Sequence, residues 1–300
     1  MRFATAEAAL WDAYGVAPRE EWLELPHGRV RALVTGDGPT IVFVHGASNS
    51  ASSWIGLAAQ LPAYRCVMVD RPGCGLSPVL RAPLTAIADL EQFADTFVFS
   101  VIDALGESSA FVVGTSFGGY FALRGTAAAP ACVRRLATLG WSVGAPIKHT
   151  PLVMRVGGSP RVAKLTARMP MPKAMLRPML KQIGLRAAVD SGAFTPAMVD
   201  WFHALLRETR TMANEVAQLP PVMTLRGMNS ELLLGDDVLH RVTAPTLLLW
   251  GRDDPFGDAV IATEFAARVP GAELELVDAG HAPWIDDAEA VAARLDAFFR

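Results

Sequence analysis

Residues 111–123 read Phe-Val-Val-Gly-Thr-Ser-Phe-Gly-Gly-Tyr-Phe-Ala-Leu, and this stretch decides the fold. A short apolar run enters a Gly-x-Ser-x-Gly turn, and a helical pattern follows the turn. So sharp a strand-to-helix turn needs small neighbours, which Gly114, Gly118 and Gly119 supply. The stretch therefore predicts a buried strand, a strained turn at Ser116 and a helix that begins at this turn.

Short continuous apolar runs, typical of strands buried on both faces, recur along the chain. They are Ile41-Val-Phe-Val, Cys66-Val-Met-Val, Phe111-Val-Val, Leu136-Ala-Thr-Leu and Thr246-Leu-Leu-Leu-Trp. Helical patterns lie between or after them, at residues 53–60, 87–104, 117–128, 258–268 and 287–299. Because strands and helices alternate, we expect an α/β fold with a mostly parallel sheet and helices on both faces.

The N-terminal residues follow a different pattern. Residues 5–14 predict a short helix that packs outside the sheet, ended by Gly15 and Pro18. Two alternating segments, residues 22–25 and 30–34, flank a turn at residues 26–28. Such a pattern predicts an antiparallel hairpin, which would form an edge of the sheet.

The alternation of strands and helices breaks between Trp141 and His240. This interval has helix-like stretches separated by glycine and proline, and it holds nine of the eleven methionines. We expect an α/β core at residues 1–142 and 240–300, with a helical cap inserted at residues 143–239 over the carboxyl ends of the strands. Flexible methionines suit an adaptable apolar pocket, although each one could equally pack the core of the insertion.

Composition excludes several classes of partner. A net charge of −3 and a pI near 6.1 give no basic surface for nucleic acid. Three scattered cysteines, Cys66, Cys74 and Cys132, form no disulfide framework, which suits a reducing compartment. The first residues lack the apolar core of a signal peptide, and no run approaches the roughly 18 apolar residues of a membrane span. We therefore expect a cytoplasmic protein that has a small apolar substrate and no stable membrane insertion, and the sequence leaves its oligomeric state open.

Ser116 is the candidate nucleophile, because the turn would expose its hydroxyl at the sheet edge. The helix that begins there would also direct free N–H groups toward the reacting centre, where negative charge develops. A glycine-rich turn without chemistry is the alternative.

A serine nucleophile needs a base, normally a histidine oriented by a carboxylate. His281 follows the alternating segment Glu273-Leu-Glu-Leu-Val-Asp278 and precedes the last helical pattern, in a loop at a strand end. The other histidines suit surface or structural roles, and they are His27, His45, His149, His203 and His240.

The candidate acid is one of two adjacent carboxylates, Asp253 and Asp254, just past the strand at residues 246–250. Either could orient His281. We favour Asp254, while Asp253 would cap or pair locally, as aspartates in such turns often do.

An oxyanion hole needs two preorganised N–H donors. The residue after the nucleophile, Phe117, offers one donor, and Ala47 in the loop after residues 41–44 offers the other. Gly46 would let this loop come close, whereas Ser48, Asn49 and Ser50 form an ordinary polar turn. No metal-ligand spacing, phosphate loop or dinucleotide fingerprint occurs, so no metal or cofactor is expected.

Taken together, these motifs make the chain similar to the α/β-hydrolase superfamily over residues 22–142 and 240–300. The resemblance is carried by His45-Gly46, Asp70-Arg-Pro-Gly-Cys-Gly-Leu-Ser77, Gly114-Thr-Ser-Phe-Gly118, Gly251-Arg-Asp-Asp254 and Gly280-His281. It implies a catalytic triad in the order serine, acid, histidine, and it supports Asp254, three residues after the strand-ending glycine. Asp70, near the sheet end, could be mistaken for a second acid, and we expect it to serve in pairing and turn formation instead.

Within the superfamily, the motifs of this chain do not all match one individual family. Haloalkane dehalogenases and epoxide hydrolases use an aspartate nucleophile, so Ser116 argues against both. Residues 250–256 resemble hydrolases that cleave carbon–carbon bonds in ring-fission products, whereas residues 47–52 lack the glycine and proline usual there.

We therefore expect a serine esterase that cleaves a carboxylic ester or lactone with an apolar part, through an acyl-enzyme. The alternatives are carbon–carbon bond hydrolysis of a vinylogous diketone and cofactor-free perhydrolase chemistry on the same triad. A non-catalytic, ligand-binding hydrolase fold is a third reading, which the complete triad disfavours.

Overall fold

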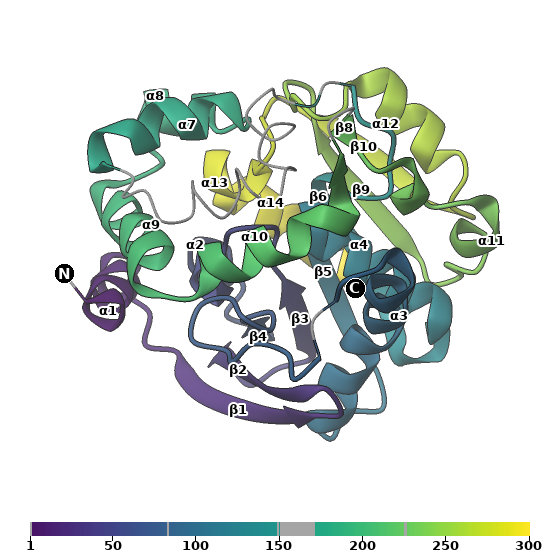
Figure 1. Cartoon of the computed structure of the whole chain (residues 1–300), viewed down its shortest axis with the longest axis horizontal. Coiled ribbons are helices and arrows are strands. Elements are labelled where there is room, and N and C mark those ends of the chain that lie inside the picture. The colour runs from purple at the N-terminus through teal and green to yellow at the C-terminus, as the bar shows by residue number, and fades with distance from the viewer. Residues whose placement is uncertain (1, 83, 149, 151–171, 225–226) are drawn as a thin grey trace.

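The computed structural model describes residues 2–82, 84–148, 150, 172–224 and 227–300 (Figure 1). Its centre is an eight-stranded sheet in the order β1-β2-β4-β3-β5-β6-β9-β10. The strands are β1 (Arg19–Leu25), β2 (Gly28–Thr35), β3 (Thr40–Val44), β4 (Arg65–Val69), β5 (Ala110–Thr115), β6 (Val133–Ser142), β9 (Thr246–Gly251) and β10 (Glu273–Val277). Strand β2 runs antiparallel to β1 and β4, and the other neighbours are parallel. The predicted mostly parallel sheet with an antiparallel hairpin at one edge is confirmed.

Each central strand is buried because alternate side chains enter two different cores. On β3, Val42 and Val44 face a core shared with helices α3 (Ile87–Ala104) and α4 (Ser116–Ala128). Ile41 and Phe43 face the opposite core, which is shared with α2 (Ile55–Ala58) and α14 (Ala288–Phe299). Since both faces are covered, an apolar residue is favoured at every position of these strands.

Helices predicted from the sequence match helices of the structure. The N-terminal helix α1 (Phe3–Ala13) packs outside the sheet, as expected, on the same side as α2. The 3₁₀ segment η1 (Ala51–Trp54) precedes α2, and the two together replace the helix predicted at 53–60. After β9 come α12 (Ala259–Ala266), α13 (Pro283–Asp286) and α14.

The insertion, residues 143–239, is mainly helical where the structure describes it. Its elements are η3 (Lys173–Met175), α7 (Leu176–Gln182), α8 (Arg186–Ser191), α9 (Pro196–Glu208), α10 (Thr211–Val222), β7 (Met223–Thr224), β8 (Gly227–Met228), η4 (Ser230–Leu232) and α11 (Asp236–Leu239). Figure 1 shows α7, α8 and α9 grouped on one side, with α10 continuing from α9. The small hairpin of β7 and β8 was not expected. His149, Met154, Met169 and Met171 lie outside the described residues, and the division into a core and a separate cap stays a prediction.

A buried ionic network ties α1 to the sheet. Arg31 on β2 donates to Glu7 at 2.8 and 3.2 Å and to Asp70 at 3.3 Å, and its side chain is only 1% exposed. Asp70 also accepts the backbone N–H groups of Ala51 at 2.7 Å and Leu76 at 3.0 Å. Burial raises the pKa of Glu7 and of Asp70, and Arg31 opposes that rise. The expected role of Asp70 in pairing and turn formation is confirmed.

Within the described residues, none of the helices combines the length and the apolar character that crossing a membrane requires.

Candidate active site

Ser116 occupies the strained turn between β5 and α4. Its φ is +52°, a left-handed conformation that is uncommon for a residue with a side chain. The turn is held because the carbonyl of Ser116 accepts the N–H of Val143 at 3.0 Å. The turn also needs Gly118, because a Cβ there would collide with the carbonyl oxygen of Val44 on β3. The structure thus contains the sharp turn that the Gly-x-Ser-x-Gly pattern predicts.

Asp254 and His281 are joined by a hydrogen bond. Nδ1 of His281 lies 2.8 Å from Oδ2 of Asp254, and the carboxylate is fully buried. The same carboxylate accepts the backbone N–H of Trp141 at 2.8 Å through Oδ2 and that of Phe256 at 3.0 Å through Oδ1. These two N–H groups orient the carboxylate, which in turn can hold the imidazole with Nε2 free.

Asp253 does not share this arrangement. Its side chain is exposed, and its backbone N–H donates to the carbonyl of Ala279 at 3.1 Å. The backbone of the turn after β9 therefore directs only Asp254 toward His281. The choice between the two carboxylates, which the residues alone left open, follows from this geometry.

Ser116 and His281 line one cavity of about 260 Å³. Among the described residues, the hydroxyl of Ser116 forms no hydrogen bond, so a bond between this hydroxyl and Nε2 of His281 is not formed in this structure. Such contacts are often long without substrate and shorten when the reacting group binds. The structure thus brings the three predicted residues to one site, where one of the two hydrogen bonds expected among them is formed.

The two predicted oxyanion donors flank Ser116. Ala47 lines the cavity, and its neighbour Gly46 packs on Ser116, where a Cβ at Gly46 would lie 3.0 Å from the Cβ of the serine. Phe117 is the second residue of α4, and the first N–H groups of a helix have no partner within the helix. Its ring points into the core beside Arg71, so only its backbone could serve the site. Both residues thus lie beside Ser116, and their role as oxyanion donors stays a prediction.

His45 and Arg71 support the loop that carries Ala47. The backbone N–H of Arg71 donates to Nε2 of His45 at 3.0 Å, and Nδ1 of His45 lies 2.8 Å from the carbonyl of Gly46. Burial and the neighbouring Arg71 hold the pKa of His45 well below its usual value, so its ring is neutral at pH 7. The guanidinium of Arg71 also donates to the carbonyls of His45 and Gly46 at 3.1 and 3.0 Å. His45 is structural, as expected.

Helix α10 of the insertion reaches this same support. Glu215 accepts from Arg71 at 2.8 Å, and the thiol of Cys74 lies 3.1 Å from the same carboxylate oxygen. Arg71 and Glu215 have only 3% and 11% of their side chains exposed. Thr211 adds a hydrogen bond of 3.0 Å from the N–H of Gly75. The insertion is therefore linked through Arg71 to the loop that carries Ala47.

The cavity lies between the strand-end loops and the helices of the insertion, and its walls are mostly apolar. The insertion contributes side chains from α7 to α10, which are Met179, Leu180, Ile183, Leu185, Phe194, Met198, Trp201, Phe202, Leu206 and Met212. Phe256, Trp284 and Ile285 complete the apolar lining from the core. Met179, Met198 and Met212 follow the predicted use of methionine in a pocket, whereas Met223 is buried outside this cavity.

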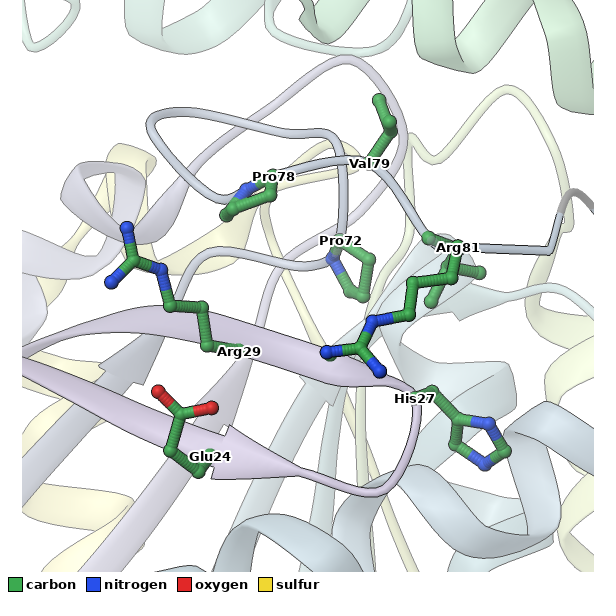
Figure 2. A pocket seen from close by; sticks show the side chains of 9 residues that line it. Glu24, His27, Arg29, Pro72, Pro78, Val79 and Arg81 are labelled. Carbon is green, nitrogen blue, oxygen red and sulfur yellow. The ribbon is translucent and has the colours of Figure 1, made fainter.

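A second cavity, of about 240 Å³, lies between the β1–β2 hairpin and the loop after β4 (Figure 2). Its lining residues are Glu24, His27, Gly28, Arg29, Pro72, Pro78, Val79, Leu80 and Arg81. None of these described residues is a serine, cysteine or threonine, and the charged side chains are exposed. Of these two cavities, only the first is lined by the candidate nucleophile Ser116.

Three contacts of the site were missed in the sequence. The hydrogen bond from the N–H of Trp141 to Asp254 and the ion pair of Arg71 with Glu215 could not be foreseen, because each joins residues far apart in the chain. Gly184 also contacts the histidine loop, where its carbonyl accepts the N–H of His281 at 3.0 Å. The only signal for Gly184 was a glycine after a helical stretch, which is common at helix ends.

No group of three or more histidine, cysteine, aspartate or glutamate side chains in the described ranges is arranged to hold a metal ion. The expectation that the chemistry needs neither metal nor cofactor stays a prediction.

Comparison with known proteins gives a consistent result. A family model described as "Alpha/beta hydrolase family" matches residues 41–294. A 2-hydroxy-6-oxononadienedioate/2-hydroxy-6-oxononatrienedioate hydrolase of Cupriavidus pinatubonensis is 25% identical over 268 residues, which are 85% of this chain and 86% of that protein.

Two solved structures share the fold. The 2-hydroxy-6-oxo-6-phenylhexa-2,4-dienoate hydrolase of Rhodococcus sp. strain RHA1 matches with a TM-score of 0.75 at 20% identity, covering 95% of this chain and all of that one. Carboxylesterase CesB of Bacillus subtilis matches with a TM-score of 0.72 at 20% identity, covering 99% of this chain and 96% of that one.

Proposed function

Because this chain belongs to the α/β-hydrolase family and is an enzyme of the hydrolase class, we propose that it cleaves a neutral carboxylic ester or lactone with an apolar part. One observation carries the proposal. Ser116 and the histidine bound to Asp254 open into the same cavity, whose other walls are mostly apolar side chains. An apolar acyl or alcohol group gains free energy by entering such a cavity.

In the proposed mechanism, Oγ of Ser116 attacks the carbonyl carbon while Nε2 of His281 takes the hydroxyl proton. The N–H groups of Ala47 and Phe117 donate to the oxyanion that forms. The intermediate then collapses, and His281 returns the proton to the leaving alcohol. Asp254 stabilises the imidazolium throughout.

The resulting acyl-enzyme is hydrolysed by the same groups. His281 takes a proton from water, the hydroxide attacks the acyl carbon, and the released Ser116 oxygen recovers the proton. One ester and one water thus give one acid and one alcohol, and the enzyme is unchanged.

A second candidate is hydrolysis of a carbon–carbon bond. It is favoured by the Cupriavidus relative and by the Rhodococcus structure, whose names describe hydrolases of oxo-dienoic acids. Both reactions would use the same serine and histidine, so the substrate separates them. Hydrolysis of vinylogous diketones without hydrolysis of esters would favour this candidate over the esterase.

The experiment compares p-nitrophenyl esters of increasing chain length, together with labelling by a fluorophosphonate. Ser116→Ala should lower ester turnover by at least about 10⁴-fold and abolish the labelling, because the nucleophile is lost. Ser100→Ala, on α3 and outside the cavity, serves as the matched control and should retain both. Labelling that persists in Ser116→Ala would remove Ser116 from the mechanism.

A further inference from the structure

Gly184 lies between the two loops that carry the acid and the base. It connects α7 to α8 in the insertion, with a φ of +92°. A Cβ at this position would lie 2.7 Å from the Cβ of His281 and 2.7 Å from Cδ of Pro255. From the opposite side, a Cβ at Gly280 would collide with the carbonyl oxygen of Gly184. The backbones here are in contact with no room for a side chain between them.

Three hydrogen bonds hold His281 and the residue before it. Asp254 holds the ring at Nδ1, and Asp286 on α13 accepts the N–H of Gly280 at 2.9 Å. The third bond runs from the N–H of His281 to the carbonyl of Gly184 at 3.0 Å. Two of these partners belong to the core, and the third belongs to the insertion.

We propose that Gly184 positions the catalytic base. The turn between α7 and α8 then helps to fix the orientation of His281, in addition to forming a wall of the substrate cavity. The role of His281 as base rests on the proposed function. Gly184 touches neither substrate nor reacting atoms, and it acts through the backbone of His281.

The proposal limits how the insertion can move. Lifting the α7–α8 turn away would break the bond to the N–H of His281 and leave that part of the loop without its packing partner. Since a misplacement of about 1 Å can cost about 100-fold in rate, a raised turn would be inactive. The turn is therefore expected to be seated while the chemical steps take place.

Gly184→Ala tests the proposal, and Gly192→Ala is its matched control. Gly192 ends α8 in the same insertion and has a similar φ of +84°, yet nothing lies within 4 Å of the added Cβ. Both variants thus introduce a methyl group at a left-handed position, and only the first pushes on His281. We expect Gly184→Ala to lower kcat about 100-fold with KM within threefold of the wild type. Gly192→Ala should keep both constants within threefold.

Proton NMR gives a readout that does not depend on turnover. The Nδ1 proton of His281, hydrogen-bonded to a buried carboxylate, should give a far-downfield signal that is absent from His281→Gln. This signal should move or vanish in Gly184→Ala and persist in Gly192→Ala. Unchanged kcat and signal in Gly184→Ala, or equal losses in both variants, would overturn the proposal.

Failure of the proposed function can be told apart from failure of this inference. A wild-type enzyme that hydrolyses no ester would contradict the proposed function. The NMR comparison of Gly184→Ala with Gly192→Ala would then still test whether Gly184 positions His281. If Gly184→Ala does not fold, hydrogen exchange at the backbone amide of His281 in the wild type tests the inference instead. A protected amide at His281 would support the bond to Gly184, and exchange at the rate of an unstructured peptide would overturn it.

Discussion

Glu215→Ala would leave the buried guanidinium of Arg71 without its carboxylate. Removing one partner of a buried ion pair costs about 3–5 kcal/mol, because the remaining charge stays buried. Here we expect the lower end, about 3 kcal/mol, since Arg71 keeps its hydrogen bonds to the carbonyls of His45 and Gly46. This loss is a large fraction of the roughly 5–15 kcal/mol by which domains are stable.

Urea unfolding at pH 7, followed by tryptophan fluorescence, measures the change in the free energy of unfolding. Glu264→Ala, which removes an exposed glutamate on α12, is the matched control and should change it by less than about 0.5 kcal/mol. Glu215→Gln keeps an acceptor for Arg71 and should lose less than Glu215→Ala. The double variant Arg71→Met with Glu215→Met removes both charges, so it should be more stable than Glu215→Met alone.

The same variants test the link between the insertion and the loop that carries Ala47. Because Arg71 also holds the carbonyl of Gly46, we expect Glu215→Ala to lower kcat under conditions in which it is fully folded. If Glu215→Ala were as stable as the Glu264→Ala control, the expected cost of leaving Arg71 buried without its carboxylate would be refuted.

Two further predictions concern the site and its support. Asp254→Asn should lower kcat on the order of 10⁴-fold with little change in KM. The carboxylate accepts through both of its oxygens, whereas an amide has only one, so its NH₂ group would face either the N–H of Phe256 or Nδ1 of His281, and in the second case it would favour the wrong tautomer of the ring. Near-normal kcat would contradict the assignment. Burial and Arg71 lower the pKa of His45, so the unfolded chain takes up a proton below pH about 6.5 while the folded protein does not. The stability from this difference is present above that pH and is lost as the pH falls, by at most about 1.4 kcal/mol per pH unit. Urea unfolding at pH 7.5 and 5.5 should therefore show a smaller loss in His45→Gln than in the wild type, and equal losses would contradict it.

Much of the fold was predictable because the central strands are buried on both faces. Residues 41–44, 66–69, 111–113 and 247–250 are apolar at successive positions, and each range lies within a strand of the sheet. The order of the strands was not predictable, because the pairing of β2 with β4 depends on contacts between distant segments. The hairpin of β7 and β8 was missed because each strand has only two residues.

The candidate site likewise has residues that could be predicted from the sequence and residues that could not. Ser116, Asp254 and His281 lie in short local motifs at strand ends, so they can be identified from the sequence. The residues that support them cannot, because a carboxylate such as Glu215 on an amphipathic helix looks like an ordinary solvent-exposed charge until its partner Arg71 is known. Gly184 likewise resembles an ordinary helix end until the histidine loop is packed on it.

The two outer strands of the sheet have a consequence for behaviour at high concentration. Among the described residues, β1 and β10 are the edge strands of the sheet, and both carry carboxylates, among them Glu24 on β1 and, on β10, Glu273 and Glu275, which pair with Arg294. A strand from another molecule that added to either edge through a copy of the same strand would bring like charges together. Charged edges of this kind discourage sheets from joining into aggregates. Replacing these glutamates with β-branched residues would remove that protection and favour self-association through the sheet.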